Sequence, residues 1–172
     1  MASTQPLIET NRLAMRPHQL SDAPFMVELN ADPEVVRYTG DGPFASTAEA
    51  EAVVRALMRQ FAERKMGRFL LLERATGTPL GWCGLKWIED ERRVDLGYRL
   101  ARAHWGKGYA TEAGAACVRY GFVELGLTTL TAEAAKDNVA SVRVLHKLGF
   151  TTVGEDHACA GLPTWRFRLE RG

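Results

Sequence analysis

The chain has 172 residues, a length that predicts one compact domain. Its hydrophobic fraction of 46% and charged fraction of 25% are ordinary for a globular protein. The net charge of +1 lacks the basic excess of proteins that bind nucleic acids or anionic membranes, so neither partner is expected.

Cysteine use and the chain start suggest where the protein resides. The three cysteines, Cys83, Cys117 and Cys159, are widely spaced and form no CxxC pair, which argues against a disulfide framework or a zinc ribbon. The first residues lack the pattern of a signal peptide, and no apolar run reaches the roughly 20 residues that span a bilayer. We therefore expect a cytoplasmic protein without a bound metal.

Hydrophobic periodicity and capping residues predict both helices and strands in the N-terminal half. Ser46 and Glu49 form a capping box, which indicates a helix from there to about Met66, ended by Gly67. The other expected elements are a first strand over 7–16, a helix that starts at Ser21, a short helical piece over 34–38, and strands over 69–74 and 80–89 joined by a turn that contains Gly and Pro.

The C-terminal half is predicted to continue this antiparallel run. The expected elements are a strand over 92–100, a helix over 107–125, a strand over 128–134, a helix over 138–148, and closing strands over 151–154 and 165–170. This order predicts one domain over residues 1–172, of the α/β or α+β class, around a central sheet.

The most informative segment is a strand followed by a glycine turn and a helix. Residues 94–100 alternate apolar and polar side chains, the turn contains Gly106 and Gly108, and a helix follows. Backbone N–H groups at such a helix start favour an anion, glycines let a phosphate approach closely, and Lys107 adds positive charge. The patterns of the P-loop and of the dinucleotide fingerprint are both absent.

Two further features accompany this turn. Gly97 lies inside the preceding strand, where glycine is typical of a bulge or of a close backbone approach. Asn138 is a good helix N-cap, and Ser141 follows it on the same side of the first turn. Arg143 and Lys147 share the opposite face of that helix, which is most simply a solvated face; contact with a phosphate is the less favoured alternative.

Together these segments resemble the GNAT (Gcn5-related N-acetyltransferase) superfamily. The strings HWGKGYATEA and DNVASVRVLHKLGF carry the likeness, and IETNRLAMRP, NADPEVVRYTG and LGWCGL extend it over nearly the whole chain. Within the superfamily the chain resembles the RimJ/RimL-like branch of ribosomal-protein N-terminal acetyltransferases. The resemblance implies a mixed, mostly antiparallel, V-shaped sheet flanked by helices, acetyl-CoA as co-substrate, and a possible homodimer.

The resemblance also implies which residues bind the coenzyme. The pyrophosphate is expected on the backbone amides of residues 105–111, and the pantetheine arm beside residues 98–101. The residues implied to contact the coenzyme are Tyr98, Leu100, Ala101, Trp105, Gly106, Lys107, Gly108, Tyr109, Ala110, Thr111, Asn138 and Ser141.

The expected reaction is direct attack of a primary amine on acetyl-CoA. Ser141 is the candidate that protonates the departing thiolate, and a strand N–H near Gly97 is the candidate that stabilises the oxyanion. The base stays open: Asp95 acts through water or is a solvent-facing carboxylate, and Glu112 acts as a base or as a helix-dipole partner. An α-amine, with a pKa of about 7.7 to 8.0, needs little help from a base.

The acceptor is expected opposite the coenzyme, near Arg37, Tyr38, Phe44, Trp82 and Trp87. Arg37 is suited to a carboxylate or phosphate on the substrate, whereas at least half of the aromatic residues are expected in the core. The acceptor is a protein N-terminus, an amino acid or a small-molecule amine. Two alternative functions are a non-catalytic coenzyme-A-binding module and a nucleotide-dependent transferase.

Overall fold

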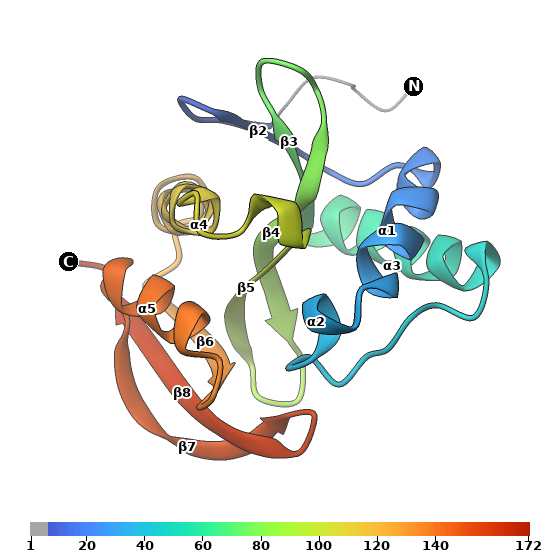
Figure 1. Ribbon diagram of the computed structural model, residues 1–172. Helices are drawn as coiled ribbons and strands as arrows, with labels where there is room; N and C mark the ends of the chain where they lie inside the picture. The colour runs from blue at the N-terminus through green and yellow to red at the C-terminus, as the bar shows by residue number, and fades with distance from the viewer. Residues whose placement is uncertain (1–6) are drawn as a thin grey trace.

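Eight strands form one sheet in the computed structural model, which describes residues 7–172 (Figure 1). The strands are β1 (Ile8–Glu9), β2 (Leu13–Arg16), β3 (Arg68–Glu73), β4 (Pro79–Ile88), β5 (Arg93–Leu100), β6 (Thr129–Ala135), β7 (Thr151–Cys159) and β8 (Leu162–Glu170). Their spatial order is β1-β2-β3-β4-β5-β6-β8-β7. The β5–β6 pair is parallel and the other neighbours are antiparallel, which confirms the predicted mixed, mostly antiparallel sheet of a single α/β domain.

Helices cover both faces of this sheet (Figure 1). One face carries α1 (Ala23–Ala31), α2 (Pro33–Val36) and α3 (Thr47–Arg64), and the other carries α4 (Tyr109–Arg119) and α5 (Val139–Lys147). A π-helical turn over Tyr120–Glu124 continues α4. No helix within residues 7–172 is both long and apolar enough to span a bilayer.

Side-chain alternation along β5 decides which residues meet which helices. Leu96 and Leu100 are buried in the large core with Ala113 and Cys117 of α4, whereas Asp95 and Arg99 point to the opposite face. A smaller core on that opposite face joins α1 and α3 through Ala23, Met26, Ala50 and Val54. Tyr98 therefore lies on the same face as α4 and α5.

The sheet splits between the neighbouring parallel strands β5 and β6. The β5–β6 pairing joins Asp95 to Thr131 and Leu96 to Ala132, and the two strands do not pair beyond this point. β5 nevertheless continues to Leu100 in an unbroken antiparallel register with β4. The V-shaped opening implied by the resemblance is thus present, and it frees one backbone edge of β5 after Leu96 for a ligand.

Several predicted elements differ in detail from the structure. The strand expected over 7–16 is a short hairpin, because Thr10 closes a turn with its N–H and hydroxyl bonded to Leu13. The helix α3 ends at Lys65 in the left-handed conformation, with a φ of 55°, and not at Gly67. Residues 107–108 lie in the turn before α4, and β7 and β8 form a longer hairpin than the two short closing strands expected.

Gly97 is a site of close approach and not of a bulge. The β4–β5 register runs without a shift from Arg93 to Leu100, and Gly97 pairs with Gly84. A Cβ atom at Gly97 would lie 2.6 Å from the Nη2 atom of Arg68. Glycine leaves room there for the Arg68 guanidinium, which lies directly over the backbone.

His18 is buried in this fold without a hydrogen bond. Neither of its ring nitrogens has a partner among the described residues, although the Asp22 carboxylate lies 3.7 Å from Nδ1. Burial lowers the pKa of His18 to about 4, although Asp22 opposes the shift, and Arg16 adds to it.

The low pKa of His18 predicts a loss of stability in mild acid. The unfolded chain takes up a proton at His18 near pH 6.5, while the folded protein does so only near pH 4. The free energy of unfolding is therefore expected to fall as the pH drops through this window, by up to about 3 kcal/mol. Urea denaturation across the window measures the fall, and His18→Phe should flatten it; a parallel fall in this variant would contradict the assignment.

Candidate active site

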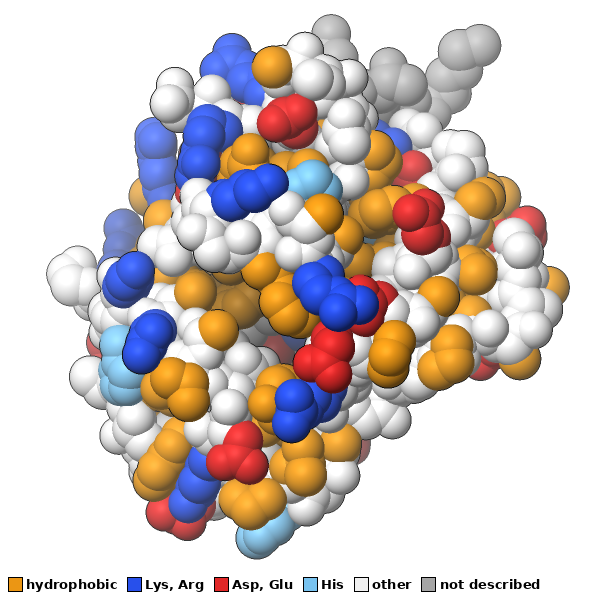
Figure 2. Space-filling view, viewed as in Figure 1, with side chains coloured by type: hydrophobic (Ala, Val, Ile, Leu, Met, Phe, Trp, Pro, Cys, Tyr) orange, Lys and Arg blue, Asp and Glu red, His pale blue; other side chains and the backbone are white. Residues whose placement is uncertain are grey.

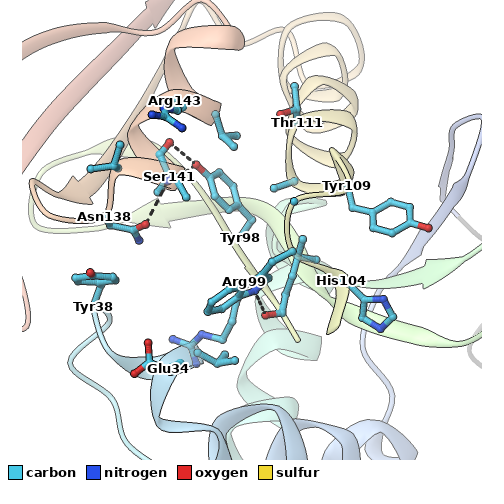
Figure 3. A pocket seen from close by; sticks show the side chains of 18 of the residues that line it. Glu34, Tyr38, Tyr98, Arg99, His104, Tyr109, Thr111, Asn138, Ser141 and Arg143 are labelled. Atoms are coloured by element: carbon cyan, nitrogen blue, oxygen red, sulfur yellow. Dashed lines mark hydrogen bonds between the residues drawn. The ribbon is translucent and has the colours of Figure 1, made fainter. Parts of the chain in front are cut away.

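A pocket of about 580 Å³ opens where β5 ends, between the N-termini of α4 and α5. Segments far apart in the sequence line it, including α2 (Figure 3). Figure 2 shows the molecule hollowed at this place, with apolar side chains on the floor and Lys and Arg gathered along the side formed by α4 and α5. Of the residues that the sequence analysis assigned to the coenzyme or the acceptor, those that line this pocket are Arg37, Tyr38, Tyr98, Leu100, Trp105, Gly106, Gly108, Tyr109, Ala110, Thr111, Asn138 and Ser141.

The glycine turn supplies an anion site at one end of the pocket. Gly106 and Gly108 have φ angles of 72° and 80°, a left-handed conformation that other residues adopt only with strain. Gly108 is the N-cap of α4, so the first N–H groups of this helix have no partner from a preceding turn. Trp105 closes the turn by donating its Nε1–H to the Leu100 carbonyl at 2.8 Å. This end of the pocket is suited to a phosphate.

The start of α5 brings a hydroxyl pair to the middle of the pocket. Asn138 caps the helix by accepting a hydrogen bond from the Ser141 N–H at 3.2 Å. The Tyr98 hydroxyl lies 2.9 Å from the Ser141 hydroxyl and also donates to the Ser141 carbonyl at 3.1 Å (Figure 3). Burial raises the pKa of Tyr98 well above its ordinary value, so this hydroxyl stays protonated and able to donate.

Two basic residues of α5 belong to the pocket wall. Arg143 and Lys147 both line it, on the same side as the glycine turn of α4. The sequence pattern indicated a solvated face for them, because periodicity alone does not reveal that this face of α5 borders a cleft. Their charges suit the phosphate groups of a ligand bound along α4 and α5.

Asp95, one of two candidate bases, lies on the other face of the sheet. Its carboxylate forms ion pairs with Arg68 at 2.9 Å and with Arg93 at 3.1 Å. Alternation along β5 points Asp95 away from Tyr98, and it is not among the residues that line the pocket. Its position therefore gives no support to a role as base, and it belongs to a structural ion-pair network with Arg93 and Glu133.

Glu112, the other candidate base, also lies outside this pocket. Its carboxylate accepts hydrogen bonds from Thr10 and Arg12 of the N-terminal hairpin. Burial raises its pKa, but these hydrogen bonds outweigh burial and hold the pKa below its ordinary value. A carboxylate held in this way is a poor proton acceptor. The alternative role of Glu112, a structural partner at the start of α4, agrees better with these contacts.

Three more expected residues are placed outside the lining. The Trp87 ring stacks with Arg64 at 5.1 Å and its indole N–H bonds to Glu89, so it does not contact the acceptor side. Lys107 and Ala101 flank lining residues without lining the pocket themselves. Two aromatic residues weighed as acceptor contacts, Phe44 and Trp82, pack instead against the smaller core between α1 and α3.

The side of the pocket where the acceptor is expected is formed by α2 and the loop that follows it. Tyr38 stacks with Arg37 at 5.3 Å, and its hydroxyl donates to the Asp137 carbonyl at 3.4 Å. Below them the buried Arg99 anchors this loop by binding Asp41 at 2.8 Å and Asn30 at 2.7 Å. Sequence patterns did not reveal Arg99, because an arginine on the polar side of a strand gives no signal of burial.

Comparisons with known proteins agree with this geometry. A family model described as "Acetyltransferase (GNAT) domain" matches residues 12–151. The chain is 34% identical over 146 residues to "Uncharacterized N-acetyltransferase p20" of Bacillus licheniformis, a match that covers 84% of this chain and 82% of the relative. It is 28% identical over 142 residues to spermidine N(1)-acetyltransferase of Escherichia coli K12, with coverage of 82% and 74%.

A solved structure of RimL, the ribosomal L7/L12 alpha-N-protein acetyltransferase, in complex with coenzyme A is similar in fold. Its TM-score is 0.82 at 16% identity, and the match covers 94% of this chain and 95% of that chain. The chain belongs to the GNAT acetyltransferase family. It is an N-acetyltransferase, of a family that uses acetyl-CoA as co-substrate, and the family resemblance drawn from its motifs is confirmed.

Proposed function

We propose that this pocket binds acetyl-CoA along α4 and α5 and transfers the acetyl group directly to a primary amine that enters beside α2. The observation that carries the proposal is the Tyr98–Ser141 hydroxyl pair, which lies between an anion site and a cleft on the acceptor side. The pocket volume of about 580 Å³ is typical of sites for small ligands.

The residues present fit the coenzyme in three places. The free N–H groups at the start of α4 suit the pyrophosphate of coenzyme A. Arg143 and Lys147 suit the remaining phosphate group of the coenzyme. The backbone edge of β5 near Tyr98, freed by the split from β6, suits the amide groups of the pantetheine arm. Asn138 orients the first turn of α5 and thereby the Ser141 hydroxyl.

Ser141 supplies the proton in the transfer. The neutral amine forms a C–N bond to the thioester carbon as the C–S bond breaks, and the sulfur accepts a proton from the Ser141 hydroxyl. The Tyr98 hydroxyl lies 2.9 Å from the Ser141 hydroxyl and holds it in place by a hydrogen bond while Tyr98 stays protonated. A backbone N–H on the free edge of β5 stabilises the negative charge on the carbonyl oxygen. The excess proton of the amine passes to water and returns through water to Ser141, which regains its hydroxyl.

The amine is proposed to enter at the α2 side, where Glu34 and Asp137 supply carboxylates and Arg37 supplies a guanidinium. Relatives act on different amines by their names, a spermidine in one case and a ribosomal-protein N-terminus in another. Both amine classes therefore belong in the first screen. A cytoplasmic location, and the homodimer implied by the family, stay predictions.

An amine screen tests the proposed function. Release of free thiol from acetyl-CoA is followed with spermidine, with single amino acids and with short peptides that carry a free N-terminus. We expect turnover with at least one class, and mass spectrometry should find one acetyl group on the primary amine. Coenzyme binding without turnover on any amine would favour the non-catalytic coenzyme-A-binding module. Competition by ATP would favour a nucleotide-dependent transferase.

A further inference from the structure

The N-terminal hairpin is fastened to the first turn of α4 through one carboxylate. Glu112 accepts hydrogen bonds from the Thr10 hydroxyl at 2.6 Å, from the Arg12 backbone N–H at 3.0 Å and from Arg12 Nε at 2.7 Å. These contacts join residues about a hundred positions apart in the chain. Glu112 therefore fixes both the backbone and the side chain of Arg12.

The other side of the Arg12 guanidinium contacts the glycine turn. Its Nη1 donates to the Lys107 carbonyl at 3.0 Å, and its Cζ lies 4.4 Å from the centre of the Tyr109 ring. A Cβ atom at Gly108 would lie 3.5 Å from its Nη2. The Arg12 side chain thus contacts Lys107 and Tyr109 and lies beside Gly108 between them.

This contact determines the direction of a backbone amide. The carbonyl of Lys107 and the N–H of Gly108 belong to one trans peptide unit, so they point in opposite directions. Because Arg12 holds the carbonyl toward the hairpin, the Gly108 N–H is turned away from the hairpin. Gly108 itself lines the pocket, so this peptide unit borders the space that is open to a ligand.

We propose that Arg12 and Glu112 form a positioning pair that preorganises the glycine turn for the pyrophosphate of coenzyme A. The proposal rests on the proposed function of the pocket. Gly106 and Gly108 make the turn flexible, and ordering such a turn at the moment of binding costs affinity. The pair lowers this cost by holding the turn in its binding conformation before the ligand arrives.

Charge and geometry make opposite predictions for Glu112. If the pair acted through charge, Glu112→Gln would remove a negative charge near an anionic ligand and would tighten binding. If the pair positions the turn, the same variant loosens the hold on Arg12 and weakens binding. The sign of the change in affinity therefore separates the two explanations.

Calorimetric titration with coenzyme A tests the pair. We expect the dissociation constant to rise about tenfold in Arg12→Ala and about threefold in Glu112→Gln. The double variant should be no weaker than Arg12→Ala, because both residues act through one contact. The matched control is Arg74→Ala: Arg74 is exposed, contacts the same hairpin through Thr10 and Glu9, and has no contact with the turn. Its dissociation constant should stay within about twofold of the wild type.

An unchanged affinity in Arg12→Ala, or a tighter complex with Glu112→Gln, would overturn the positioning role. Failure of the wild type to bind coenzyme A would overturn the proposed function instead. A measurement without ligand tests the positioning role independently of the proposed function. Hydrogen exchange of the backbone amides of residues 106–109, followed by NMR, should be faster in Arg12→Ala than in Arg74→Ala. Equal exchange in two variants of equal melting temperature would also overturn the positioning role.

Discussion

Replacing Ser141 with alanine is expected to lower kcat for acetyl transfer by about a hundredfold or more, because the departing thiolate loses its proton donor. The Michaelis constant for acetyl-CoA should change little, since the backbone edge of β5 and the start of α4 remain in place. Steady-state kinetics with the best amine of the screen measures both constants.

Tyr98→Phe is the matched variant for this prediction. It keeps the Ser141 hydroxyl but removes the hydroxyl that lies 2.9 Å from it, so a smaller loss of about tenfold in kcat is expected. In the double variant, kcat should be little lower than in Ser141→Ala alone, because the tyrosine acts through the serine. Full activity of Ser141→Ala would show that water protonates the thiolate and that the proposed role of Ser141 is wrong.

Replacing Gly84 with alanine is expected to destabilise the fold by more than about 3 kcal/mol. A Cβ atom there would overlap the carbonyl oxygen of Gly67 and would lie 2.9 Å from the Cα of Arg68. Both obstacles are backbone atoms at the start of the neighbouring strand β3, which cannot rotate away as a side chain can. Strands β3 and β4 would have to separate at this point. The other neighbour of Gly84 is Gly97 of β5, with which it pairs.

Gly154→Ala is the control for this stability prediction. Gly154 lies on β7 with no atom within 4 Å of its would-be Cβ in the described structure, so its variant should stay within about 0.5 kcal/mol of the wild type. Urea denaturation of the two variants and the wild type gives the comparison. Similar midpoints for Gly84→Ala and Gly154→Ala would contradict the close approach at Gly84.

Local patterns in the sequence were sufficient to predict the centre of the site. Alternation over residues 94–100, the glycines at 106 and 108, and the cap at Asn138 each rest on neighbours in the chain. The structure has a strand, a glycine turn and a capped helix at these places, and the turn and the cap line one pocket. Spacing placed Ser141 beside this cap, whereas its role in the reaction came from the family resemblance and stays a prediction.

The misplaced residues depend on contacts between distant segments. Glu112 is fastened to Thr10 and Arg12 by a hairpin that the sequence suggested only as one strand. Asp95 is held by Arg68 from another strand, and no local pattern indicates this partner. In both cases a polar residue at a functional motif satisfies a long-range contact, which sequence spacing does not reveal.

The most direct test of the central claim is a titration of the isotope-labelled protein with acetyl-CoA, followed by the chemical shifts of its backbone amides. We expect saturable binding with the largest shifts at residues 97–101, 105–111 and 138–141, the three segments that meet at the pocket. Absence of binding, or shifts confined to other parts of the chain, would contradict the assignment of this pocket to the coenzyme.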